Sequence, residues 1–224
     1  MGHLSIMDRR RLLLLPLGLL ATAPALAQPA PRPPAPAPAP AAIDRAAVQR
    51  VEAYLNAMRT LRARFLQIGQ NGASAEGQAW ISRPGRMRFD YDPPEPILLV
   101  ASGGQVMMLD RQLGQPNIVP AASTPLGLLL RDEIRLSGDI TVTATERAGG
   151  LLRIALARTG QPAEGRLTLV FDENPMQLRQ WAVLDAQGRQ TTVTLSAIDT
   201  TVRPDNRIFD FNDPRFLEAE GIRR

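Results

Sequence analysis

Two kinds of hydrophobic periodicity divide the chain. Between residues 43 and 61, apolar residues recur at spacings of three and four, which is typical of one face of an amphipathic helix. From there to the C-terminus, apolar and polar positions mostly alternate, as they do in strands with one buried face. The apolar positions of the helix are Ile43, Ala47, Val48, Val51, Leu55 and Met58. One helix followed by many strands predicts a mainly β fold in which the helices cover a sheet.

Eleven strands are predicted, because short alternating segments are separated by turn-forming residues such as Asn-Gly, Gly-Gly and Pro-Pro. Strands this short, at a spacing of roughly 8–12 residues, are typical of an antiparallel meander that curls into a barrel or a sandwich. The predicted strands are 61–69, 75–82, 86–92, 96–101, 105–110, 114–119, 139–146, 151–158, 164–171, 176–185 and 189–199.

A short helix is expected between the sixth and seventh strands, at residues 124–133. Thr124 is a favourable N-cap, and Pro125 suits the first helical position because its missing N–H would be unpaired there anyway. This helix and the one at 43–61 are the candidates to cover the apolar face of the sheet.

Residues 77–91 contain two of these strands, separated by Arg83-Pro84-Gly85. Proline lacks a backbone donor and glycine tolerates unusual backbone angles, so this triplet predicts a bend. Beyond the bend the residues alternate strictly, which predicts one apolar and one wet face. The apolar face carries Met87, Phe89 and Tyr91, and the wet face carries Arg86, Arg88 and Asp90.

Arg83 has the same parity as Ala79 and Ile81 in the strand before the bend. If that strand keeps its alternation to its end, Arg83 lies at the rim of the apolar face. A guanidinium in such a place needs hydrogen-bond acceptors, because an unpaired buried charge is costly. A structural arginine that fixes the bend is the alternative to a functional one.

The first 27 residues have the features of a secretory signal peptide. Three arginines at 9–11 precede an apolar run at 12–23, and Ala25-Leu26-Ala27 forms a small-x-small cleavage site. The apolar run is too short and wrongly flanked for a membrane-spanning helix, although an uncleaved anchor is the alternative. The arginines leave both the Sec and the twin-arginine export routes open. We expect an exported, soluble mature protein that begins near Gln28.

Residues 28–42 consist almost entirely of proline and alanine. Such a segment cannot bury enough apolar surface to fold, so it is predicted to be an extended tether. A spacer function and a low-complexity remnant are equally compatible with it. The remaining residues, 43–224, are expected to form one domain.

The composition argues against catalysis. The chain has no cysteine, and its single histidine, His3, lies in the signal peptide. The commonest general base and the commonest metal ligands are therefore missing from the mature protein, as is a lipid-attachment cysteine. The carboxylate pairs Asp90/Asp92 and Asp132/Glu133 are expected to be solvated surface groups. We predict no enzyme activity, no metal and no cofactor, which leaves the binding of something apolar.

The basic residues of the chain are all arginines, and they are scattered along it. A nucleic-acid interface would require clustered basic residues, so nucleic acid is not an expected partner.

Four motifs follow one another in an unusual combination. They are Arg-Phe-Leu-Gln at 64–67, G-x-x-W-x-x-R-P at 77–84, T-P-L at 124–126 and Phe-Asp-Phe at 209–211. In order and spacing, residues 43–212 resemble the LolA family of periplasmic outer-membrane lipoprotein carriers. The second motif together with the third is fairly specific, whereas either alone would be weak.

The resemblance implies an incomplete antiparallel β-barrel of about 11 strands, covered by the N-terminal helix and by a short lid helix. It implies that Arg83 holds the lid closed by hydrogen bonds to the lid backbone. It also implies a cavity for acyl chains. Each residue assigned to this cavity could instead serve ordinary core packing, which is the alternative. The residues implied are Leu55, Met58, Leu61, Phe65, Ile81, Met87, Phe89, Tyr91, Leu126 and Leu129.

The same resemblance implies a monomeric periplasmic carrier whose cargo is acylated lipoproteins. The carrier would receive this cargo from an inner-membrane ABC exporter and deliver it to an outer-membrane receptor or to the outer membrane itself. Two departures from the family pattern are visible: methionines at 107–108, where aromatics are common, and a tail at 212–224 without a proline-glycine extension. Carriage or sensing of another lipid on the same scaffold stays open.

Overall fold

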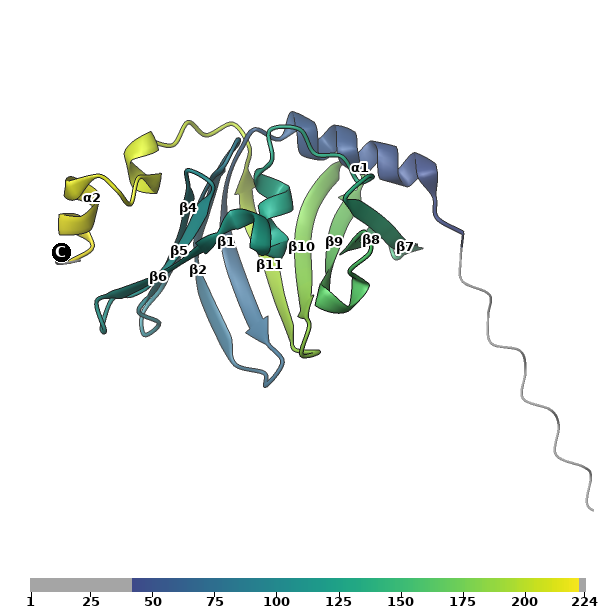
Figure 1. The fold of residues 1–224 in the computed structure, drawn as a ribbon. Helices are drawn as coiled ribbons and strands as arrows, with labels where there is room; N and C mark the ends of the chain where they lie inside the picture. The colour runs from purple at the N-terminus through teal and green to yellow at the C-terminus, as the bar shows by residue number, and fades with distance from the viewer. Residues whose placement is uncertain (1–41, 222–224) are drawn as a thin grey trace, which may run out of the picture. The chain divides into compact units, whose positions relative to one another are not determined.

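The computed structural model describes residues 42–221, and their main feature is one open antiparallel sheet of 11 strands (Figure 1). The order across the sheet is β6-β5-β4-β3-β2-β1-β11-β10-β9-β8-β7, so that β1 pairs with the last strand and β6 and β7 form the two edges. The mainly β fold and the count of 11 strands are therefore confirmed. The predicted signal peptide and nearly all of the predicted tether lie outside the described residues.

The strands keep close to their predicted positions. They are β1 (Thr60–Gly69), β2 (Ser74–Ser82), β3 (Arg86–Tyr91), β4 (Ile97–Ser102), β5 (Gln105–Asp110), β6 (Gln115–Pro120), β7 (Ile140–Ala148), β8 (Leu151–Arg158), β9 (Gly165–Glu173), β10 (Met176–Asp185) and β11 (Gln190–Asp199).

Helix α1 (Arg45–Ala57) is shorter than the predicted helix at both ends. Asp44 caps it by accepting a hydrogen bond from the Ala47 amide at 2.9 Å, and the chain turns into extended backbone at Met58. Its apolar face packs on the sheet through Ala47, Val51 and Leu55, as the three-and-four spacing predicts.

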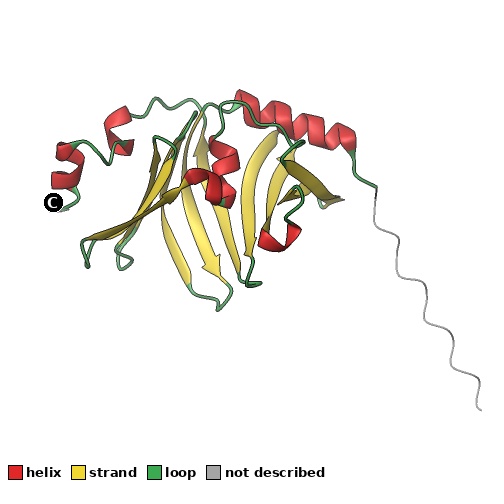
Figure 2. Ribbon diagram, in the orientation of Figure 1, coloured by secondary structure: helices red, strands yellow, loops and turns green. Residues whose placement is uncertain are grey.

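The connection between β6 and β7 has to pass from one edge of the sheet to the other. It carries two 3₁₀ helices, η1 (Ala121–Ser123) and η2 (Pro125–Leu130), which lie over one face of the sheet in Figure 2. We call residues 121–130 the lid. Thr124 caps η2 through its hydroxyl, as predicted, but the helix is 3₁₀ rather than α and ends at Leu130 instead of residue 133.

The lid and α1 cover the inner face of the sheet, where the larger hydrophobic core lies. This core combines residues from α1, from η2 and from most of the strands. Its largest fully buried side chains include Phe65, Phe171, Trp181 and Leu129. The two predicted helices therefore do cover the apolar face.

The outer face of β2–β5 is also covered, and the prediction of a wet face on residues 86–91 was wrong in this respect. Residues after β11 return across it and form η4 (Asn206–Phe209) and α2 (Pro214–Ala219). A second core joins this C-terminal segment to β4 and β5, and Arg88 beneath it is only 8% exposed. The second core consists of Leu98, Val100, Met107, Leu109, Phe209, Phe211 and Phe216.

Within residues 42–221, none of the helices is both long and apolar enough to cross a membrane. In the same residues, no three acidic or histidine side chains gather in a way that could hold a metal ion. The 3₁₀ turn η3 (Pro162–Glu164) connects β8 to β9.

Candidate functional site

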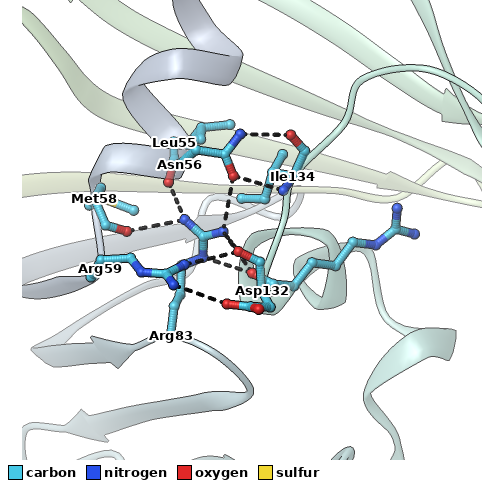
Figure 3. Close-up of polar contacts among 8 residues, drawn as sticks. Leu55, Asn56, Met58, Arg59, Arg83, Asp132 and Ile134 are labelled. Carbon is cyan, nitrogen blue, oxygen red and sulfur yellow. Dashed lines mark hydrogen bonds and ion pairs between the residues drawn. The ribbon is translucent and has the colours of Figure 1, made fainter.

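Arg83 lies in the turn between β2 and β3, below the C-terminal end of α1 and beside the residues that follow the lid (Figure 3). The side chain is 5% exposed, although it is a permanently charged group. Its backbone is fixed as well, because its amide donates to the Arg59 carbonyl at 2.8 Å. The sequence placed this residue at the rim of the apolar face, and it lies where that face meets α1 and the lid.

The guanidinium of Arg83 donates almost entirely to backbone carbonyls. On the α1 side, Nη1 donates to the carbonyl oxygens of Leu55 and of Met58, the latter at 3.2 Å. On the lid side, Nε and Nη2 donate to the Arg131 carbonyl at 2.9 and 2.7 Å. Nη2 also donates to the Asp132 carbonyl at 3.0 Å. One side chain thus joins the end of α1 to the end of the lid.

The Leu55 carbonyl is in the last turn of α1, and the other acceptors lie just beyond the ends of α1 and η2. The last carbonyls of a helix have no partner within the helix, and they carry the negative end of its dipole. A guanidinium presents five donors in a rigid fork and matches several such acceptors at once. Burial lowers the pKa of Arg83, and the neighbouring Arg59 adds to this effect, while Asp132 opposes it.

Two further residues complete the junction, Asn56 in the last turn of α1 and Arg59 between α1 and β1, and the sequence analysis did not single them out. The amide of Asn56 exchanges hydrogen bonds with the backbone of Ile134, and Arg59 donates to the Asp132 carbonyl at 2.9 Å and to its carboxylate at 3.0 Å. Asn56 is on the polar side of α1 and Arg59 lies just beyond its end, where polar residues are the rule, so the pattern alone gave no signal. A second backbone contact ties the turn to the lid, from the Gly85 amide to the Leu130 carbonyl at 2.8 Å.

The ten apolar residues implied for the acyl cavity come together in the inner core. Eight of them are buried, while Tyr91 and Leu126 are half-buried against the same core. Aromatic rings form its middle: Phe65 lies 5.0 Å from Phe89 and 4.9 Å from Tyr91, centroid to centroid. In this closed arrangement Leu129 of the lid is itself buried in the core.

An open cavity of about 640 Å³ lies beside this core, between the lid and the ends of β8, β9 and β10. None of the ten implied residues lines it. Its apolar wall includes Leu128, Leu130, Ile140, Leu156, Leu167 and Val183, and charged residues stand around it. Its volume is in the usual range for small-ligand pockets, which is roughly 300–1,000 Å³.

The comparison with protein families matches residues 56–212 to the outer membrane lipoprotein carrier protein LolA. The chain belongs to the LolA family. The matched region begins at Asn56 and ends just after Phe211, so it includes Arg83 and all of its acceptors except Leu55, the lid and the start of the C-terminal segment.

Two of three curated relatives carry the same name. An outer-membrane lipoprotein carrier protein of Methylococcus capsulatus is 27% identical over 178 residues, covering 76% of this chain and 85% of the relative. One of Pseudomonas aeruginosa is 29% identical over 182 residues, covering 77% and 86%. An uncharacterized protein of Rickettsia prowazekii is 22% identical and covers 73% and 76%.

Solved structures are similar at a lower level. An uncharacterized conserved protein from Thermus thermophilus has a TM-score of 0.46 at 10% identity, covering 75% of this chain and 94% of that chain. A LolA superfamily protein from Nitrosomonas europaea has a TM-score of 0.39 at 11% identity, covering 74% and 98%.

Proposed function

We propose that this LolA-family protein is a periplasmic carrier that shelters the acyl chains of lipoproteins between its sheet and its lid. It receives them from an inner-membrane ABC exporter and delivers them to an outer-membrane receptor or to the outer membrane itself. It works as a monomer, without catalysis, metal or cofactor. The observation that carries the proposal is the Arg83 junction, in which one guanidinium holds two covering elements over an apolar face, almost entirely through their backbone carbonyls.

The energies on the two sides of this exchange are comparable. Hydrogen bonds to a charged group contribute about 1.5–3 kcal/mol each to stability. Burying an acyl chain gains about 0.8 kcal/mol per methylene. A chain that buries about six to eleven methylenes therefore offsets the loss of three Arg83 contacts, and the closing lid can in turn help to expel the chain.

The ten implied residues supply the surface for the chain in this proposal. Leu126 and Leu129 belong to the lid, so its movement would withdraw them from Phe65, Met87 and Phe89 and uncover an apolar groove. The remaining members, Leu55, Met58, Leu61, Ile81 and Tyr91, would form the wall beneath α1 and along β1–β3.

Reconstituted transfer tests the proposal with Arg83→Leu and a matched control, Arg86→Leu. Arg86 is on the other side of the same turn, and its side chain donates to the nearby Ser82 carbonyl, at 3.4 Å, rather than to α1 or the lid. We expect Arg83→Leu to fold and to accept lipoprotein, but to pass it on more slowly, because closure no longer compensates for release. Arg86→Leu should behave as wild type. Wild-type loading and release by Arg83→Leu would show that Arg83 only supports the fold.

Native mass spectrometry of protein purified from its own periplasm identifies the cargo. A bound triacylated lipoprotein is the expected result. A free lipid in its place would favour the second candidate, carriage of another lipid on the same scaffold.

A further inference from the structure

The lid is held at its other end by a second arginine. At the end of β8, Nη2 of Arg158 donates to the carbonyl of Ala122 in η1. On the opposite side of η1, the Ala121 amide donates to the Gly104 carbonyl at 2.8 Å. The lid is therefore attached at its η1 end to β8 and to the β4–β5 turn, and at its η2 end to Arg83 and Gly85.

The Arg158 contact joins two walls of the 640 Å³ cavity. Ala122 and Arg158 both line this cavity, which extends between the lid and the apolar residues Leu156, Leu167 and Val183. As long as the contact exists, η1 stays against β8 at the rim of the cavity. Without it, η1 could move away from β8 while η2 remained attached at Arg83.

The two arginines differ in the free energy needed to break their contacts with the lid and the residues that follow it. Arg83 is buried, so breaking its contacts would leave a desolvated charge and several carbonyls without partners. The side chain of Arg158 is 44% exposed, and water can replace Ala122 as its partner. The carboxylate of Glu164, 3.8 Å from its Nε, offers a second alternative.

We propose that Arg158 is a second, weaker hold on the lid, and that the lid opens first at the η1 end to admit the tip of an acyl chain into this cavity. The proposal rests on the proposed carrier function. Arg158 is a positioning residue in this scheme: it sets the distance between η1 and β8 and thereby controls entry. Arg83 then determines whether the whole lid opens.

The lid can be followed directly because the chain has no cysteine of its own. Ser123→Cys in η1 provides a single site for an environment-sensitive fluorophore. We expect Arg158→Gln to shift the emission of the ligand-free protein to the red, since η1 becomes more exposed to water. Arg153→Gln is the control, because Arg153 is also on β8 but pairs with Glu146, at 3.9 Å, and is not among the residues that line the cavity.

Uptake of a fluorescent fatty-acyl probe tests the role in entry. We expect Arg158→Gln to take up the probe about two- to five-fold faster than wild type, the range that one exposed contact of a charged group allows. Val183→Phe adds bulk to the apolar wall and should cancel this gain when combined with Arg158→Gln.

Two results would overturn the proposal: identical emission in Arg158→Gln and Arg153→Gln, or a gain in uptake that survives Val183→Phe. Failure of the wild-type protein to bind the acyl probe would count against the carrier function instead. The emission of the ligand-free protein would still decide whether Arg158 holds the lid.

Discussion

Asn56 of α1 is hydrogen-bonded in both directions to the backbone of Ile134. Its Nδ2 donates to the Ile134 carbonyl at 2.9 Å, and its Oδ1 accepts from the Ile134 amide at 2.8 Å. The side chain thereby pairs with the loop as a neighbouring strand would. It fixes the chain just beyond the lid, so movement of the lid is confined to the residues between β6 and Ile134, which include the Arg131 and Asp132 carbonyls held by Arg83.

Replacing Asn56 by alanine should therefore loosen the attachment of α1 to this loop. It would leave the amide and the carbonyl of Ile134 without partners, and each unpaired buried group costs about 1–3 kcal/mol. We expect the free energy of unfolding to fall by an amount in this range in Asn56→Ala, measured by urea denaturation. Gln49→Ala, at an exposed position of the same helix, is the control. Equal stabilities of the two variants would contradict the anchoring role.

A glycine in the lid offers a way to disturb it without touching either arginine. A Cβ on Gly127 would lie 2.2 Å from the Ala121 carbonyl oxygen, so η1 and η2 can pack together only because this residue has no side chain. Gly127→Ala should push the two turns apart and leave the sheet intact. Hydrogen exchange should then be faster in residues 121–130 than in wild type, and unchanged in β1 and β2.

Ala122→Ser, which adds one atom at an exposed neighbouring position, should leave exchange in the lid unaffected. Uniformly faster exchange across the whole domain in Gly127→Ala would mean that the lid does not move independently of the sheet.

The sequence was most informative where local chemistry decides the structure. Alternation located the strands, and the Thr124-Pro125 pair located the start of η2. The parity of β2 placed Arg83 at the rim of the apolar face, where it lies. Its acceptors could not be predicted, because they are carbonyls of segments about 25 to 50 residues away in the chain, and any residue could have supplied them.

The outer face of β3 shows the limit of pattern analysis. Arg88 and Asp90 alternate with apolar residues, as solvent-facing residues do, yet the C-terminal segment covers them more than a hundred residues later in the chain. Asp90 was expected to be a solvated carboxylate, but it accepts hydrogen bonds from Arg88 at 2.7 Å and from Arg111 at 2.5 Å. Alternation reports that a face is polar, and it does not report whether another segment with matching charges covers it.

Asp90 should make the stability of the domain depend on pH. Burial tends to raise its pKa, but the hydrogen bonds from Arg88 and Arg111 outweigh it and lower the pKa below the ordinary value of 3.8. Stabilisation by such a group is complete above the pKa of the unfolded state and is lost as the pH falls through the lower pKa of the folded state.

Asp90→Asn tests this dependence. We expect wild type to be more stable than the variant at neutral pH, and the difference in unfolding free energy to shrink as the pH falls below about 4. Urea denaturation at a series of pH values measures it. A difference that stays constant down to about pH 3 would mean that the ionisation of Asp90 does not contribute to stability.

Glu220 attaches α2 to the outer face, and its loss should release the C-terminal segment. Its carboxylate accepts from Arg88 Nη2 at 2.8 Å and from Arg111 Nε at 2.9 Å, and the same two arginines hold Asp90. Glu220→Gln would leave two arginines with one carboxylate in a partly buried place.

Breaking a buried ion pair costs about 3–5 kcal/mol, and the partial exposure of Arg111 reduces this to about 1–3 kcal/mol. We expect a loss of stability of this size in Glu220→Gln, together with faster proteolytic cleavage between β11 and α2. Such cleavage would expose the apolar residues of β4 and β5 beneath, so the variant should also bind a hydrophobic dye. Glu218→Gln, on the exposed side of α2, should match wild type in all three measurements. If Glu220→Gln also matches wild type, the apolar contacts of Phe209, Phe211 and Phe216 alone are sufficient to hold the segment in place.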